Sequence, residues 1–169
     1  PVWIAGSTHG NENDELLAAH GRVLADHPKA LLILVPRHPD RFEPVAERAV
    51  KEGLTLARRS RGEDPGRTQV YLGDTMGELM MLYGASDLAF VGGSLIERGG
   101  HNPLEPAGWG IPVFSGPHIF NFETIYQRLL DDRGVKLVAD SDDLAAHVSS
   151  LFSDDTERQA IGQRAMAVV

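Results

Sequence analysis

The residues best suited to chemistry lie in one short stretch, residues 92–106, which contains the sequences GGS and GGHNPLEP. Glycines let a backbone approach a ligand closely. Asn102 before Pro103 is typical of a helix start, where free N–H groups stabilise a phosphate. A carboxylate at Glu105, in the first helical turn, can accept two hydroxyl hydrogen bonds, as a ribose diol requires. The stretch predicts a nucleotide-sugar site; the alternative is a glycine-rich turn before an ordinary capped helix, with Glu105 as a dipole partner.

Two earlier segments carry polar residues of the same kind, GSTHGNE at 6–12 and PRHP at 36–39. In the first, Ser7 and Thr8 can contact a phosphate or a sugar carboxylate, and His9 can act near the reacting centre. The alternative is a capping box, in which Thr8 or Asn11 only begins the following helix. In the second, Arg37 offers a fork of donors to a base carbonyl or a phosphate. A turn bounded by prolines, with a surface arginine, is an equal alternative.

Two further segments complete the set, GDTMGE at 73–78 and GPHIFNFE at 116–123. Backbone N–H groups near Thr75 can recognise a base edge, although Asp74 or Thr75 as a simple N-cap fits equally well. His118 and Asn121 are expected to face the same cleft. The predicted ligand-binding residues are Ser7, Thr8, His9, Arg37, His38, Thr75, Met76, Gly77, Gly93, Ser94, His101, Asn102 and Glu105.

The seven histidines of this cysteine-free chain do not predict a metal site. Three fall in helical patterns, where we expect surface positions: His20, His27 and His147. The other four lie on separate loops and form no close pair of ligands: His9, His38, His101 and His118. No cofactor is expected.

Short apolar runs alternate with helical patterns along the chain, which is typical of parallel βαβ units. Strands are expected at 2–5, 31–35, 70–72, 88–91, 113–114 and 135–138, and helices at 12–25, 41–52, 76–84, 103–109, 122–131, 144–152 and 155–168. The polar segment 60–68 is typical of a mobile surface loop. The fold class predicted is α/β, a Rossmann-like parallel sheet of about six strands with helices on both faces. Ligands bind such a sheet beyond the carboxyl ends of its strands, and every segment singled out above follows a strand.

The bulk composition excludes several classes of partner. With 169 residues and 42% hydrophobic content, the chain is expected to form a single domain, residues 1–169. Its net charge of -8 repels phosphate backbones, so no nucleic-acid partner is expected. No apolar run reaches the length of a membrane helix, so we expect this piece to be soluble. It opens as a strand already under way, and we therefore expect a preceding part that is absent here.

Six motifs, taken together, resemble the C-terminal domain of bacterial 3-deoxy-D-manno-octulosonic acid (Kdo) transferases. They are STH, VPRHPDRF, GDTMGEL, FVGGSL, GGHNPLEPAGWGIPVFSGP and FNFE, in this order, and they span nearly the whole chain. The resemblance implies one half of a two-domain GT-B glycosyltransferase that transfers Kdo from CMP-Kdo to a lipid A precursor, with inversion and without a metal. It also implies that the acceptor site, the catalytic base and the membrane-associated segment lie in an N-terminal domain, at the cytoplasmic face of the bacterial inner membrane.

The same resemblance implies roles for single residues. Arg37 and the backbone of Met76 and Gly77 would hold the cytidine, Glu105 the ribose, and Ser94, Asn102 and nearby N–H groups the phosphate. The chain departs from the family after STH, where members usually read Glu-Gly-Glu and this sequence reads GNE, so that only the second acidic residue, Glu12, is kept. By itself the chain is expected to bind CMP weakly and to transfer nothing.

Two other functions fit the residues. A UDP-sugar 2-epimerase has the same two-domain fold and a similar region of glycine and glutamate. A non-catalytic module would use the same loops only to dock a partner domain. A preference for UDP over CMP would favour the epimerase over the Kdo transferase. Absence of nucleotide binding would favour the docking module.

Overall fold

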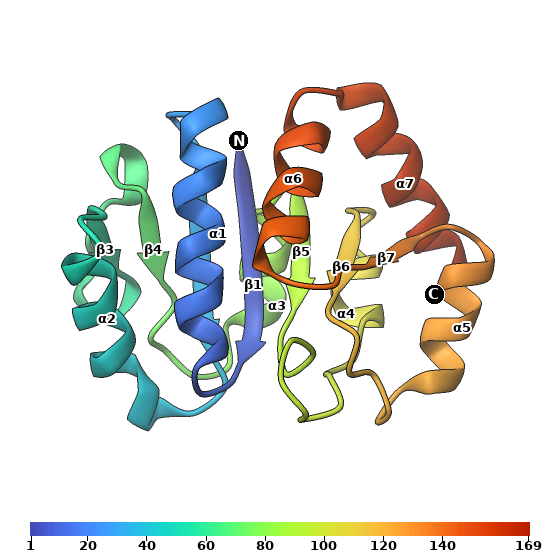
Figure 1. Cartoon of the computed structure of the whole chain (residues 1–169), viewed down its shortest axis with the longest axis horizontal. Helices are drawn as coiled ribbons and strands as arrows, with labels where there is room; N and C mark the ends of the chain where they lie inside the picture. Colours follow the sequence, from blue (N-terminus) through green and yellow to red (C-terminus); the bar gives the residue numbers. More distant parts are fainter.

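A computed structural model describes all residues, 1–169, as a seven-stranded parallel sheet with helices on both faces (Figure 1). The strand order is β3-β4-β2-β1-β5-β6-β7. The strands are β1 (Val2–Thr8), β2 (Leu31–Pro36), β3 (Leu56–Arg58), β4 (Val70–Leu72), β5 (Leu88–Val91), β6 (Val113–Ser115) and β7 (Val135–Leu137). The predicted α/β architecture is confirmed, and the sheet has one strand more than the six expected.

Helices cover the two faces of the sheet in separate groups. They are α1 (Glu12–Asp26), α2 (Phe42–Lys51), α3 (Leu79–Gly84), α4 (Leu104–Ala107), α5 (Glu123–Asp131), α6 (Ser141–Phe152) and α7 (Asp155–Val168). Buried residues of α1, α2 and α6 share one apolar cluster, whereas those of α3 to α5 and α7 belong to two clusters on the opposite face. Because both faces are covered, the strands are almost continuously apolar.

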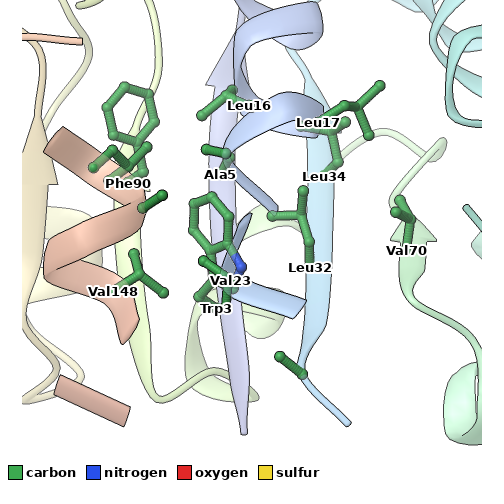
Figure 2. Close-up of a cluster of buried hydrophobic side chains, with 14 of the residues drawn as sticks. Trp3, Ala5, Leu16, Leu17, Val23, Leu32, Leu34, Val70, Phe90 and Val148 are labelled. Atoms are coloured by element: carbon green, nitrogen blue, oxygen red, sulfur yellow. The ribbon is translucent and has the colours of Figure 1, made fainter. Parts of the chain in front are cut away.

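The central strand shows how the two faces alternate. Trp3 and Ala5 of β1 belong to the larger cluster, and Ile4 between them belongs to the cluster on the other face, as a period of two requires. Figure 2 shows Trp3 and Ala5 beside Leu16 of α1 and Leu34 of β2. Trp3 is fully buried, so this packing fixes α1, and the loop that precedes it, against the sheet.

The strand order reverses between β1 and β5. From β1 the chain moves outward to β2 and on to β3 and β4, and it then returns to the other side of β1 as β5. In an open parallel sheet, such a reversal separates the loops that follow the two strands and leaves a crevice at their carboxyl ends. These ends lie at the lower side of Figure 1, where the loops after β1 and β5 diverge.

The segment that was expected to be a mobile loop is built around a buried carboxylate. Asp74 accepts hydrogen bonds from the backbone N and the Oγ of Ser60, at 2.8 and 2.6 Å, and from Nε of Arg58, at 2.8 Å. These bonds hold the single turn 59–61 directly after β3. Residues 60–68 lie at the surface, as expected, and these bonds hold the start of the segment. The strand β3 before it was missed because its residues Leu-Ala-Arg include no β-branched or aromatic side chain.

One histidine expected at the surface is fully buried. His20 of α1 accepts a hydrogen bond from Nε1 of Trp3 at 3.0 Å, and its Nε2 lies 2.7 Å from the carbonyl oxygen of Gln69. Because a carbonyl only accepts, Nε2 carries the proton and Nδ1 is bare. Burial lowers the pKa of His20 to about 4. The surface prediction was wrong because a helical pattern gives the period of a helix but not the face on which each polar residue falls.

None of the helices combines the length and apolar character needed to cross a membrane.

Candidate functional site

A pocket of about 310 Å³ lies at the carboxyl ends of the strands, beside the reversal of strand order. Loops after β1, β2, β4 and β5 line it, and most of its polar residues were singled out from the sequence. Its lining consists of Ser7, Val35, Pro36, Arg37, Thr75, Met76, Gly77, Leu79, His101 and Glu105. The structure therefore brings together residues that are nearly a hundred positions apart in the chain.

Ser7 reaches this pocket through an irregularity in β1. The pairing of β1 with β2 shifts register between Gly6 and Thr8, and Ser7 between them has φ 55°, a left-handed conformation that is uncommon for a residue with a side chain. A bulge of this kind re-aims a side chain at the end of a strand. The backbone N of Arg37 donates to the carbonyl oxygen of Thr8 at 2.8 Å, which ties the loop after β2 to the same point.

The glycine-rich loop after β5 is organised by a carboxylate from within the chain. Glu12, at the start of α1, is fully buried, and its two oxygens accept four backbone N–H groups. His9 and Gly93 donate to Oε1 at 3.1 and 2.8 Å, and Ser94 and Leu95 donate to Oε2 at 3.1 and 3.0 Å. Burial raises the pKa of Glu12, and the four donors oppose that rise. These N–H groups are therefore already satisfied and are not free for a phosphate.

Three predicted ligand-binding residues have side chains that serve the loops instead. Ser94 is fully buried; its Oγ donates to the carbonyl oxygen of Val91 at 2.6 Å and accepts from the backbone N of Gly116 at 2.8 Å. Thr8, also fully buried, donates to Asn13 at 2.6 Å.

Asn102 is partly exposed, and its Oδ1 caps the first turn of α4 by accepting from the backbone N of Leu104 at 3.0 Å. The predicted cap at Asn102 is present, but α4 has only four residues. The hydroxyls of Ser94 and Thr8 do not face the pocket, which corrects the expectation that they contact a ligand.

The glycines of this loop make room for neighbouring protein groups. A Cβ on Gly92 would lie 2.5 Å from the carbonyl oxygen of Ser7, so glycine is needed where the chain leaving β5 packs against the end of β1. Gly93 has φ 73°, and a Cβ there would lie 3.3 Å from the rings of both His9 and His101. The glycines were predicted to let a ligand approach the backbone, and the groups that lie close to these two positions are protein atoms.

Three histidines meet beside the pocket, contrary to the expectation that they lie apart. Nε2 of His9 and Nε2 of His101 are 2.7 Å apart, and the ring of His38 approaches that of His9 edge-on, with centroids 5.3 Å apart. They come from the loops after β1, β5 and β2, which are neighbouring strands, so their carboxyl ends converge. No group of three or more His, Cys, Asp or Glu side chains has an arrangement that holds a metal ion.

The remaining pocket residues provide complementary chemistry. Arg37 is exposed on one wall, and Glu105 is partly buried on another, where burial raises its pKa. Between them the loop 75–77 presents its backbone, with Gly77 at φ 82° and the side chain of Met76 60% exposed. Oγ1 of Thr75 donates to Glu78 at 2.5 Å, and this bond braces the loop. The pocket can thus hold an anion near Arg37, a diol at Glu105 and a flat ring over the loop.

Asn121 and His118 do not line the pocket. Nδ2 of Asn121 donates to the carbonyl oxygen of Arg98 at 2.8 Å and thereby holds the second glycine pair in place. A larger cavity of about 580 Å³ lies at the β7 edge of the sheet, bounded by β6, β7, α6 and α7, and contains none of the predicted residues. The candidate site is therefore the smaller pocket.

The sequence has clear relatives, although no protein-family model matches it. It is 47% identical over 171 residues to a 3-deoxy-D-manno-octulosonic acid transferase of Haemophilus influenzae, covering 100% of this chain and 40% of that protein. The transferase of the same name from Bordetella pertussis is 36% identical, with 99% of this chain and 40% of that protein covered. The chain thus spans about two fifths of the length of these relatives.

Solved structures give the same result. The C-terminal CMP-Kdo binding domain of WaaA from Acinetobacter baumannii superposes with a TM-score of 0.94 at 37% identity, over 99% of this chain and 88% of that one. Anabaena HepE, solved with UDP and glucose, has a TM-score of 0.70 at 17% identity over 42% of its length, which shows a shared fold. The expected half of a GT-B fold is confirmed. The chain belongs to the 3-deoxy-D-manno-octulosonic acid transferase family, in which it corresponds to the C-terminal domain.

Proposed function

We propose that this chain binds CMP-Kdo as the donor half of an inverting glycosyltransferase that transfers Kdo to a lipid A precursor. The observation that carries the proposal is the pocket in which Arg37, the loop 75–77, His101 and Glu105 meet. The named CMP-Kdo binding domain from Acinetobacter baumannii, at 37% identity, supports the choice of donor. The UDP-sugar 2-epimerase and the docking module are not favoured, because the relatives with high identity are Kdo transferases.

Each part of the CMP moiety is assigned a group in or beside the pocket. Glu105 accepts the two ribose hydroxyls and the loop 75–77 holds the cytosine ring. Arg37, which the family resemblance assigned to the cytidine, is assigned here to the phosphate together with His9 and His101. As the bond between phosphate and sugar breaks, negative charge grows on the phosphate. Cationic and N–H donors beside the phosphate therefore stabilise the leaving CMP. Because Glu12 already accepts hydrogen bonds from the N–H groups of residues 93–95, we assign the phosphate to these side chains and not to those three amides.

The rest of the reaction is proposed to depend on the part of the protein that these 169 residues do not include. The acceptor site, the base that removes the acceptor proton and the contact with the cytoplasmic face of the inner membrane are all assigned there. The relatives from Haemophilus influenzae and Bordetella pertussis, of which the chain covers 40%, are long enough to supply a second domain.

The role of Glu105 is tested with two ligands that differ in one hydroxyl. We expect Glu105→Ala to weaken CMP binding by about 1.5–3 kcal/mol, because hydrogen bonds to a charged group are lost. Calorimetry should also show that the wild type prefers CMP to 2′-deoxy-CMP and that the variant does not. Glu47→Ala, at an exposed position of α2, is the matched control and should bind both ligands as the wild type does. Unchanged CMP affinity in a folded Glu105→Ala variant, or a wild-type preference for UDP, would refute the proposal.

A further inference from the structure

The hydrogen-bonded pair of His9 and His101 has a geometry suited to sharing a proton. Their planes are within 2° of parallel and their centroids are 4.9 Å apart, whereas the two Nε2 atoms are only 2.7 Å apart. The centroid separation exceeds the nitrogen separation by about the width of one ring. The rings therefore meet end to end in nearly one plane, with Nε2 pointing at Nε2, which is the best alignment for an N–H···N hydrogen bond.

The other nitrogen of each ring is free of the protein. No hydrogen bond from the chain reaches Nδ1 of His9 or of His101, and no buried side-chain nitrogen or oxygen lacks a partner. Both Nδ1 atoms must therefore be accessible to solvent. The Cδ2 atoms of both rings face Gly93, so the Nδ1 edges point away from the glycine loop. His101 also lines the pocket.

The number of N–H groups depends on the protonation of the pair. Two neutral imidazoles carry two protons: one lies between the Nε2 atoms, and the other is on Nδ1 of the ring that accepts. A third proton gives both rings an Nδ1–H and gives the pair a positive charge. Protonation therefore adds one outward-facing donor and one charge, and both favour an anion.

The surroundings keep the empty pair neutral. Burial is the largest cause, and the neighbouring imidazoles and arginines add to it, so that the pKa of His9 falls to about 4 and that of His101 is also lowered. The cationic or titratable groups that lower these pKa values are Arg37 and His38 after β2 and Arg98 after β5. Two carboxylates also lie nearby: Glu12 of α1, which accepts from the backbone N of His9, and Glu105 of α4, which lines the same pocket as His101. An anion bound here would offset the repulsion from these cations.

We propose that the His9–His101 pair takes up one proton from solvent when the anionic part of the donor binds beside it, so that donor binding is linked to protonation. This inference rests on the proposed function, because it assumes that the phosphodiester of the donor occupies this part of the pocket. Glu12 supports the inference: because the N–H groups of residues 93–95 are already satisfied, an anion beside the pair cannot use them, and the pair and the neighbouring arginines are the side-chain donors there.

The test uses a ligand whose own charge does not change. A phosphate monoester such as CMP titrates near pH 6, whereas a diester does not, so the probe is the methyl phosphodiester of CMP. Calorimetry at pH 6 in buffers of different ionisation enthalpy gives the number of protons taken up. We expect about 0.5–1 proton for the ester and none for cytidine, and an affinity that falls by up to about tenfold for each unit of rising pH.

Two variants assign the proton to the pair. The double variant His9→Gln/His101→Gln keeps a hydrogen-bonding group at both positions but has no imidazole that can take up a proton, so proton uptake should disappear whether or not the affinity changes. His147→Gln, on α6 and outside the pocket, is the matched control and should keep the wild-type uptake. In the wild type, nitrogen NMR of His9 and His101 should show both rings moving toward the protonated form as the ester is added.

The outcomes separate the two proposals. Binding of the ester by the wild type without proton uptake, or equal uptake in the double variant, would overturn the shared-proton inference and leave CMP-Kdo binding intact. Failure of the ester, CMP and cytidine to bind at all would overturn the proposed function and this inference with it.

Discussion

Replacing Glu12 by Gln removes one of the two acceptor oxygens that hold the loop after β5. Each oxygen accepts two N–H groups, from His9 and Gly93 on one side and from Ser94 and Leu95 on the other. A glutamine keeps one oxygen and presents an NH₂ group to the other two donors. Two buried N–H groups then lose their partners, at about 1–3 kcal/mol each, so we expect Glu12→Gln to lower the free energy of unfolding by about 2–6 kcal/mol.

Urea unfolding, followed by circular dichroism and extrapolated to water, measures this loss. Glu15→Gln makes the same chemical change on the exposed side of α1 and should stay within about 0.5 kcal/mol of the wild type. Amide resonances of Gly93 and Leu95 should shift in the first variant and not in the second. A loss below about 0.5 kcal/mol in Glu12→Gln would refute the reasoning, because it would mean that the four N–H groups do not depend on the carboxylate.

Two further perturbations test other parts of the structure. Gly93 has φ 73° and lies against both histidine rings, so Gly93→Ala should lower the free energy of unfolding in urea by about 1–2 kcal/mol. Gly21→Ala, in the open middle of α1, is the control and should raise it. Equal effects of the two substitutions would contradict the conformation assigned to Gly93. The pKa of His20 is about 4 in the folded protein and near 6.5 in the unfolded chain, so the unfolded chain binds more protons between these two pH values. The free energy of unfolding should therefore fall by up to about 3 kcal/mol as the pH is lowered from 6.5 to 4. An NMR titration that protonates His20 above pH 6 would disprove its burial as the hydrogen-bond partner of Trp3.

The location of the site was predictable from the sequence because it depends on local patterns. Apolar runs mark the strands, and in a parallel sheet the segments after them share one edge, so that Arg37 and Glu105 were correctly expected on the same side. The strand β3 was not predictable: it is as short as β4, β6 and β7, but its residues Leu-Ala-Arg include no β-branched or aromatic side chain, unlike every other strand.

Side-chain partners were less predictable, because they depend on contacts between distant positions. A serine in a glycine-rich loop has the same sequence signature whether its hydroxyl faces a ligand or, as for Ser94, two backbone groups of the protein. Glu12 and Gly93 are 81 positions apart, and His9 and His101 are 92 apart. For Glu12, the sequence near it predicts only that a helix begins there. The alignment of its carboxylate with four N–H groups requires the β1 to β5 pairing, which no single segment specifies.

The carboxylate of Glu12 also determines when the loop after β5 loses its conformational freedom. Because an anion that belongs to the chain already occupies these N–H groups, the segment 93–95 is ordered as the domain folds and not when the donor arrives. The entropy lost in fixing these three residues therefore lowers the free energy of unfolding and does not weaken donor binding. Association with the donor need not wait for this loop to close, and hydrogen exchange at these amides should be equally slow with and without ligand.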